Sequence, residues 1–349
     1  MNRMPNSIGA GFNTLFRMMK ASYFLHFLLS ILVVSCAKKE QESIRQTSGK
    51  INTISVLIDD QLWNGEIGDS IRNKFASAVI GLPEEEPLFT INQYPVKLLE
   101  GYATNSRAIL VIKKGVKTQF EIKRNQYATP QNVFHISGTT AEEIVLLLEK
   151  HSPEIIQRIE SGEIAESQRI SSKSASTHSI IKKLFHVGLQ VPSDFELVMR
   201  KPNFIWLKHN NNGGSSSLLV YQFPLSIIKA NAISNSIRTM RDSVGKYIQG
   251  TEPNTHMISE TGYSPYFFKT KIDNRLAYET RGTWQLQNDY MSGPYINYTI
   301  MDSVQKRVIV LEGFCYSPSK EKRDTMHELD AIMQSVQLLK NTTFTPHKK

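Results

Sequence analysis

The chain has 349 residues and a formal net charge of +9, with 40% hydrophobic and 21% charged residues; these proportions are those of a soluble globular protein. Its basic residues are scattered, whereas nucleic-acid-binding proteins gather them in a stripe with interleaved aromatics, so we expect no nucleic-acid partner. The length is sufficient for one large or two ordinary domains, each with a hydrophobic core.

The first predicted element is an apolar segment over residues 21–37 that carries no formal charge. A membrane-spanning helix needs about 20 consecutive apolar residues, and serines and a histidine shorten this segment further. Arg17 and Lys20 precede it, no acidic residue stands upstream, and a polar segment follows. This is the pattern of an export signal peptide, which we place at residues 1–35.

The first 17 residues add nothing that an export signal needs, so translation is expected to begin at Met18 or Met19. The signal also removes three basic residues, which lowers the formal net charge of the mature chain from +9 to +6. Such a charge favours solubility beside an anionic membrane.

The signal ends on Val33-Val34-Ser35-Cys36, which resembles the bacterial lipobox. The resemblance implies that Cys36 is lipidated and becomes the first residue of the mature protein. Two acyl chains already hold a protein stably on a bilayer. The alternative is a signal that ends near a cysteine by chance. Ala37 favours the outer membrane, facing the periplasm, over the inner one, and exposure on the cell surface stays an open alternative.

Residues 36–50 are polar and lack periodicity, which predicts a flexible lipidated tether. An N-terminal α+β unit is then expected over residues 51–162. It begins with a β-branched strand over residues 51–59 and a helix that Asp60 caps. Three further strands are predicted over residues 106–114, 118–124 and 132–138, the first two as a hairpin around Gly115, and a helix follows from about Thr139.

A serine-rich segment over residues 163–178 is the best domain boundary in the chain, although part of it has helical character. A C-terminal α+β unit is expected over residues 179–340, with a disordered tail at residues 341–349. Its strands are predicted on either side of residues 201–203 and over residues 218–225, 266–271, 275–285, 295–302 and 306–316, with helices over residues 233–247 and 326–336. The chain is therefore predicted to be α+β, with two units of mainly antiparallel sheets, each covered by helices, which lie on one face of the sheet in the C-terminal unit.

Motifs for catalysis are absent. The histidines form no close pair and no His-Glu-x-x-His occurs, so we expect no metal. There is no G-x-S-x-G elbow for a serine nucleophile and no glycine-rich phosphate loop, so we expect no cofactor. Cys315 is the only other cysteine, and the alternation of its strand predicts a buried thiol. With Cys36 acylated, no disulfide can form within the chain.

The first candidate ligand site follows the first strand of the globular part. Asp59 and Asp60 end this strand, and Trp63 and Glu66 follow within the next helix. Paired carboxylates at the end of a strand can divide acid and base roles or bind a small ligand. Helix capping and a solvated helix surface explain the same acids without any ligand.

The second candidate is a predicted strand that carries Glu279, Arg281 and Trp284 among several tyrosines. Glu279 and Arg281 are two residues apart and therefore lie on the same face of the strand, while Trp284 has the opposite parity. Aromatic residues with an arginine are typical of partner surfaces. Aromatic residues are also simply favoured in strands.

Several blocks of the chain resemble a family of Bacteroidetes lipoproteins catalogued as domain of unknown function 4837. The blocks are "GKINTISVLIDDQLWNGEIGDSIR", "GLPEEEPLF", "SRAILVI", "PNFIWL" and "ETRGTWQLQNDYMSGPYINYTIMD", in this order behind the lipobox. The resemblance extends from Gly49 to about Leu339. It implies an address in the cell envelope, but it carries no activity and no catalytic residues.

The sequence thus favours a lipid-anchored cell-envelope protein of unknown biochemical role that acts as a non-catalytic binding or assembly module, with an envelope protein as its partner. The alternative is an envelope hydrolase or small-ligand receptor with a carboxylate cleft near Asp59, Asp60 and Glu66. Whether the chain is an enzyme stays open at this stage.

Overall fold

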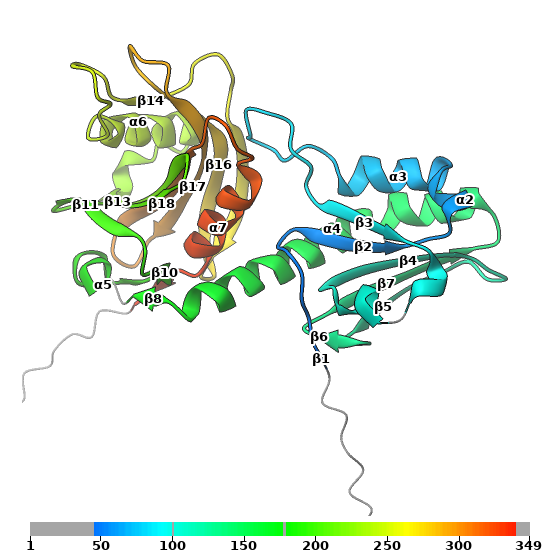
Figure 1. Cartoon of the computed structure of the whole chain (residues 1–349). Helices are drawn as coiled ribbons and strands as arrows, with labels where there is room; N and C mark the ends of the chain where they lie inside the picture. The colour runs from blue at the N-terminus through cyan, green and yellow to red at the C-terminus, as the bar shows by residue number, and fades with distance from the viewer. Residues whose placement is uncertain (1–44, 100, 177–178, 340–349) are drawn as a thin grey trace, which may run out of the picture. The chain divides into compact units, whose positions relative to one another are not determined.

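A computed structural model describes residues 45–99, 101–176 and 179–339 (Figure 1). The predicted signal, Cys36, most of the tether and the C-terminal tail lie outside the described residues. Helices and strands are both abundant, which confirms the α+β class. No helix in the described ranges has the length and apolar character needed to cross a membrane.

The N-terminal unit contains a five-stranded sheet in the order β3-β2-β4-β7-β5. Its strands are β2 (Thr53–Leu57), β3 (Thr90–Tyr94), β4 (Ala108–Lys114), β5 (Gln119–Arg124) and β7 (Asn132–Gly138). Strand β2 pairs in parallel with β3 and β4, and β4 pairs in parallel with β7, so this sheet is mainly parallel rather than antiparallel.

The predicted hairpin around Gly115 is wrong, because β7 lies between β4 and β5 and pairs with both. The burial of the strands explains the order. Residues 108–112 of β4 are buried whichever face they point to, as expected for an interior strand covered on both sides. Strand β5 is only half-buried and occupies the edge.

Helices α2 (Asp60–Trp63), α3 (Glu66–Phe75) and α4 (Ala141–Ser172) follow strands of this sheet. Their apolar residues, among them Ile67, Ile71, Ile144 and Leu148, form one core with the inward-facing residues of β2, β4 and β7. A smaller cluster around Ile109 and Val111 covers the other face. The alternation of neighbouring β4 residues between the two clusters follows from the period of a strand.

Helix α4 begins with a reciprocal cap. The Thr140 hydroxyl accepts a hydrogen bond from the Glu143 N–H at 3.2 Å, and the Glu143 carboxylate accepts one from the Thr139 N–H at 2.7 Å. A hydrogen bond from Thr118, together with those from Thr139, lowers the pKa of Glu143 to about 2. The helix then continues to Ser172 and so occupies much of the predicted linker over residues 163–178.

The continuation is held by a buried ion pair. Two of the guanidinium nitrogens of Arg107, Nε and Nη2, donate to the Glu163 carboxylate of α4, each at 3.0 Å. Arg107 immediately precedes β4. The Asn52 N–H, just before β2, donates to the same carboxylate at 3.1 Å. These contacts fix the serine-rich end of α4 against the start of the sheet.

The C-terminal unit contains an eight-stranded sheet, whose antiparallel pairing confirms the prediction. Along the sheet its strands are β11 (Glu196–Lys201), β12 (Phe204–Asn211), β13 (Gly214–Pro224), β18 (Arg307–Tyr316), β17 (Ser292–Asp302) and β16 (Arg275–Leu286); β14 (Met257–Ser259) and β15 (Tyr266–Ile272) both pair with β16.

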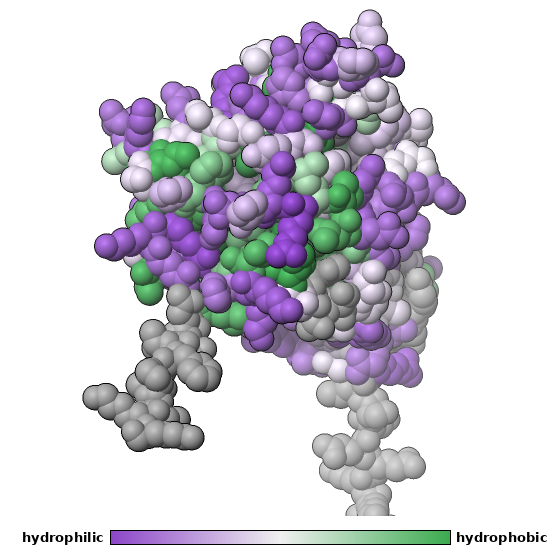
Figure 2. All heavy atoms as spheres, turned by 90° about the vertical axis from the view of Figure 1, so that its left-hand side faces the viewer, coloured by the Kyte–Doolittle hydropathy of each residue, from purple (hydrophilic) through white to green (hydrophobic). Residues whose placement is uncertain are grey.

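Helices cover both faces of this sheet, whereas the sequence predicted helices on one face only. Helix α7 (Arg323–Gln334) and the short α5 (Ser179–Phe185) pack on one face, against residues such as Ile296 and Ile300. Helix α6 (Ile233–Gly245) packs on the opposite face, against Tyr221 and Val310. On the side of the molecule seen in Figure 2, hydrophilic side chains separate the apolar ones into several patches.

Short elements complete the chain. Strand β1 (Arg45–Gln46) pairs in parallel with β6 (Ala128–Thr129), β8 (Ala175–Ser176) pairs with β10 (Val191–Pro192), and β9 (Val187–Gly188) pairs with β19 (Gln337–Leu338). Turns of 3₁₀ helix lie at Val96–Leu98, Gly101–Asn105 and Leu225–Ile227.

The loop between α3 and β3 caps helix α7. The two oxygens of the buried Glu86 carboxylate accept hydrogen bonds from the backbone N–H groups of Lys322 at 2.7 Å and Arg323 at 2.8 Å. Arg323 in turn donates to the Pro87 carbonyl at 2.9 Å. Free N–H groups and the helix dipole make a helix N-terminus a natural site for a carboxylate.

We predict that Glu86→Ala lowers the free energy of unfolding by about 2 kcal/mol, because two buried N–H groups lose their acceptor. Urea denaturation of the purified protein measures this change. The matched control is Glu85→Ala at the exposed neighbouring position, which is expected to change stability by less than about 0.5 kcal/mol. Equal midpoints for the two variants would contradict the capping role.

Candidate functional site

The first predicted constellation lies on the exposed surface of the N-terminal unit. Asp59 occupies the N-cap position of α2 without a side-chain capping bond, so Asp60 is not the cap that the sequence predicted. Asp60 instead accepts a hydrogen bond from Gln93 Nε2 at 3.1 Å. Glu66 begins α3, and neither of the two cavities described below is lined by these three carboxylates.

The contacts of Trp63 are those of a packing residue. Its ring packs at the border of the N-terminal core, and the Arg72 guanidinium lies 4.6 Å from the ring centroid. Arg72 also pairs with Asp69 at 2.6 Å on the helix surface. The structure therefore separates Trp63, which packs, from the solvated carboxylates around it.

Of the second predicted constellation, the structure brings Glu279 and Arg281 together but not Trp284. Glu279 and Arg281 lie on the same face of β16, as their spacing predicts, and form an ion pair. Trp284 lies on the opposite face, only 2% exposed, where its indole N–H donates to the Cys315 carbonyl at 3.2 Å. Trp284 is thus a core residue of the α6 side and does not share a site with the ion pair.

Helix α7 adds residues that the sequence did not single out. Arg281 Nη2 lies 2.8 Å from the Asp330 carboxylate, which also accepts hydrogen bonds at 2.8 Å from the Tyr298 hydroxyl and from Gln334. Burial, followed by the nearby Asp330 and Glu279, raises the pKa of Tyr298 well above its ordinary value. We call Glu279, Arg281, Tyr298 and Asp330 the charged cluster.

The charged cluster borders a cavity of about 220 Å³. Glu160 of α4 also lines it, and burial, with help from Asp330 and Glu279, raises the pKa of Glu160, while Arg281 acts in the opposite direction. The remaining lining residues are Asn52, Val79, Leu88, Phe89, Ile164, Arg323, Met326, His327 and Gln334. The cavity is small, and its charges are largely engaged with one another.

One contact here resembles a nucleophile and its base: His327 Nε2 lies 3.1 Å from the Ser167 hydroxyl. Burial lowers the pKa of His327. Ser167, however, is a buried residue within the C-terminal turns of α4 and does not line the cavity. An acyl-transfer site requires a nucleophile exposed to substrate beside free N–H donors, and the interior of a helix offers neither.

A second buried network lies on the α6 face. Arg241 of α6 pairs with Glu312 of β18 at 2.9 Å, both almost fully buried, and its guanidinium lies 3.8 Å from the Tyr295 ring centroid. Tyr221 donates to Glu312 at 3.1 Å. Arg241 belongs to α6, whereas its partners in this network lie on strands of the sheet, so the network joins α6 to the sheet.

Cys315 is buried as the sequence predicted. Burial raises the pKa of its thiol to about 12. A thiol acts as a nucleophile only when ionised, so Cys315 is inert at neutral pH.

Over residues 45–99, 101–176 and 179–339, no three His, Cys, Asp or Glu side chains gather as metal ligands would.

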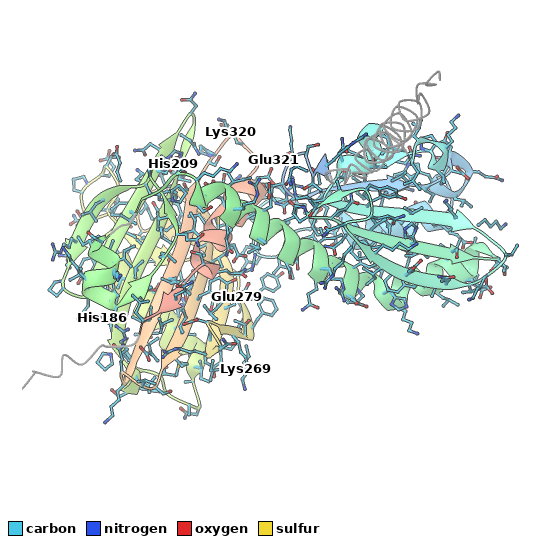
Figure 3. The ribbon with its side chains drawn as sticks, turned by 90° about the horizontal axis from the view of Figure 1, so that it is seen from below. His186, His209, Lys269, Glu279, Lys320 and Glu321 are labelled. Carbon is cyan, nitrogen blue, oxygen red and sulfur yellow. The ribbon has the colours of Figure 1, made fainter. Side chains whose placement is uncertain are left out.

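Beside the charged cluster lies an exposed aromatic strand. In the β15–β16 register Tyr266 stands opposite Arg281, and Phe268 stands opposite Glu279. Tyr266, Phe267 and Phe268 are 53%, 36% and 40% exposed, although they are consecutive and so point to both faces of the sheet. Figure 3 shows Lys269 of β15 and Glu279 of the neighbouring strand.

The loop that caps α7 also reaches this strand pair. Gly81 has a φ of +89°, and a Cβ there would lie 2.8 Å from the Arg281 Cβ. Residues 78–85 of the loop, together with Glu260, Tyr263 and Tyr266, line a cavity of about 690 Å³ above β16. A glycine is required at this crossing because of both its backbone conformation and the close approach.

The chain matches two family models, each over one unit. Residues 174–335 match the model of a domain of unknown function, DUF4837. Residues 47–172 match a second domain of unknown function, DUF8532. No curated protein matches the chain. The resemblance to domain 4837 is therefore confirmed for the C-terminal unit, while the N-terminal unit, for which the sequence predicted the same family, matches a different model.

We predict that Arg281→Met lowers the free energy of unfolding by about 3 kcal/mol, because the mostly buried Asp330 and Glu279 carboxylates lose their cation. Urea denaturation measures the loss. The control is Arg238→Met, which removes an exposed pair with Asp242 at 3.8 Å and is expected to cost less than about 1 kcal/mol. A cost no larger than that of the control would show that the charged cluster does not hold α7 on the sheet.

Proposed function

We propose that this chain is a lipid-anchored cell-envelope protein whose described part is a non-catalytic module that binds an envelope protein. The observation that carries the proposal is strand β15, on which three consecutive aromatic residues are exposed at an edge of the large sheet. Exposed aromatic side chains on an edge strand are typical of interaction sites.

The charged cluster supports a binding role over a catalytic one. Arg281 is held by two carboxylates, and Asp330 accepts hydrogen bonds from Tyr298 and Gln334 in addition. Such mutual engagement fixes α7 on the sheet and leaves little capacity for a substrate. It also gives the neighbouring β15 a rigid support, which favours binding because little order must be gained on association.

The membrane anchor in this proposal is supported by the sequence alone. The apolar segment, the lipobox at residues 33–36 and the polar tether predict that Cys36 carries the lipid. We place the protein at the outer membrane, facing the periplasm. The lipid would keep the binding module near its partner and raise the effective concentration of each for the other.

We predict that Cys36→Ala abolishes lipidation and moves the protein out of the membrane fraction. The measurement combines labelling of cells with a radioactive fatty acid and fractionation of their envelopes. The control is Cys315→Ala, which changes the other cysteine and is expected to leave both lipidation and membrane retention intact. Unchanged membrane retention of Cys36→Ala would overturn the anchor.

We predict that Phe267→Ser combined with Phe268→Ser reduces partner retention several-fold in a crosslinked pull-down from envelopes, because exposed aromatic anchors contribute most of the binding energy at such surfaces. The control is Tyr290→Ser, which removes a fully exposed aromatic residue from a loop. Partners retained equally by both variants would contradict the role of β15. A wild-type chain that retains no partner would contradict the proposed function itself.

A further inference from the structure

The two edges of the large sheet differ in how they are protected. Strand β11, at one edge, is interrupted by a register shift between Leu197 and Met199 and carries Glu196, Arg200 and Lys201. Bulges and charges of this kind prevent another strand from adding to an edge. Strand β11 is therefore a blocked edge.

Strand β15, at the other edge, lacks these devices along its aromatic half. All seven of its residues pair with β16 in continuous register, and within the described residues it pairs with no other strand. Tyr266, Phe267 and Phe268 lie in its first half, while Lys269 and Lys271 follow in the second. A regular, open, aromatic edge is the structure to which an extended peptide can add as a further strand.

The 690 Å³ cavity adjoins the aromatic half of β15, since Tyr266 lines it. Its ionisable lining consists of Glu84, Glu85, Glu260 and the two phenols of Tyr263 and Tyr266, without any lysine, arginine or histidine. In a chain with a formal net charge of +9, this is a local acidic site.

Part of the acidic charge is uncompensated. Glu84 pairs with Lys322 at 2.6 Å, and Glu260 accepts a hydrogen bond from the neutral Thr283 hydroxyl. In the described part of the chain no hydrogen bond or ion pair engages the Glu85 carboxylate. Tyr263 is 79% exposed, and its ring is free to cover a cation.

We infer that an extended segment of a partner protein adds to β15 as a ninth strand of the sheet and places a lysine or arginine side chain in this acidic cavity. An added strand lies about 4.8 Å from β15. The side chain of a lysine or an arginine is longer than this distance, so it can reach from the added strand to the cavity beside β15. Backbone pairing supplies affinity, and the cavity selects the basic side chain. This inference rests on the proposed function and names the chemistry of its partner.

The probe for the test is a fluorescent peptide of seven residues, the length of β15, in which lysine and valine alternate and both ends are blocked. Peptides with glutamine or glutamate in place of lysine serve as comparisons, as does a lysine peptide methylated on alternate backbone nitrogens. Fluorescence anisotropy measures binding to the purified full chain in detergent.

We expect the lysine peptide to bind the wild-type chain, and the glutamate and N-methylated peptides to bind much more weakly. Glu85→Gln combined with Glu260→Gln should weaken binding of the lysine peptide about tenfold while leaving the glutamine peptide unaffected. The control combines Glu142→Gln with Glu196→Gln, two exposed acids outside the cavity, and should leave binding unchanged.

Two outcomes would overturn the inference, and the first of them leaves the proposed function standing. One is equal binding of the lysine, glutamine and glutamate peptides, or binding of none, while envelope partners still depend on Phe267 and Phe268. The other is a dimer in sedimentation analysis that Phe268→Ser dissociates, because the occupant of β15 would then be a second copy of the chain. If envelope partners are retained but do not depend on β15, the inference fails together with the binding role of β15, whereas a chain that retains no partner contradicts the proposed function itself.

Discussion

Helix α7 is held by carboxylates at two points, and the arrangement of the candidate sites depends on them. The Glu86 carboxylate accepts hydrogen bonds from the backbone N–H groups at the N-terminus of the helix, and Asp330 of the helix forms an ion pair with Arg281 of β16. The first contact draws the loop that contains Glu86 to the C-terminal unit, and the second fixes the helix on β16. The larger cavity exists because that loop, held in this way, passes over β16 at Gly81.

Buried charge recurs at several junctions between packed elements. Arg107 binds Glu163 where α4 crosses the start of β4, Arg241 binds Glu312 under α6, and Asp302 binds two arginines between β16 and β18. Desolvation offsets much of the attraction in such pairs, so they stabilise the fold little. Their geometry is demanding, and in this chain they occur where one element must dock on another in a single register.

Whether the sequence predicted a feature correctly depended on how far apart in the chain the interacting residues lie. The strand alternation that placed Glu279 and Arg281 on one face and Trp284 on the other is local, and the structure confirms it. Strand β4 pairs with β7, which is not the next strand along the chain, because β5 lies between them in sequence. The predicted hairpin around Gly115 was therefore wrong. Asp330 was missed because nothing near it in the sequence shows that α7 packs on β16.

Local patterns in the chain were sufficient for the α+β class, most helix and strand positions in the C-terminal unit and the buried thiol of Cys315, because each depends on periodicity. The lipid site at Cys36 rests on a short motif and stays a prediction. Strand order, the partners of the buried charges and the open edge at β15 emerged only in the tertiary structure. The reason is physical: burial and the desolvation of charge are set by residues distant in sequence, and a strand is an edge only because no other strand pairs with it.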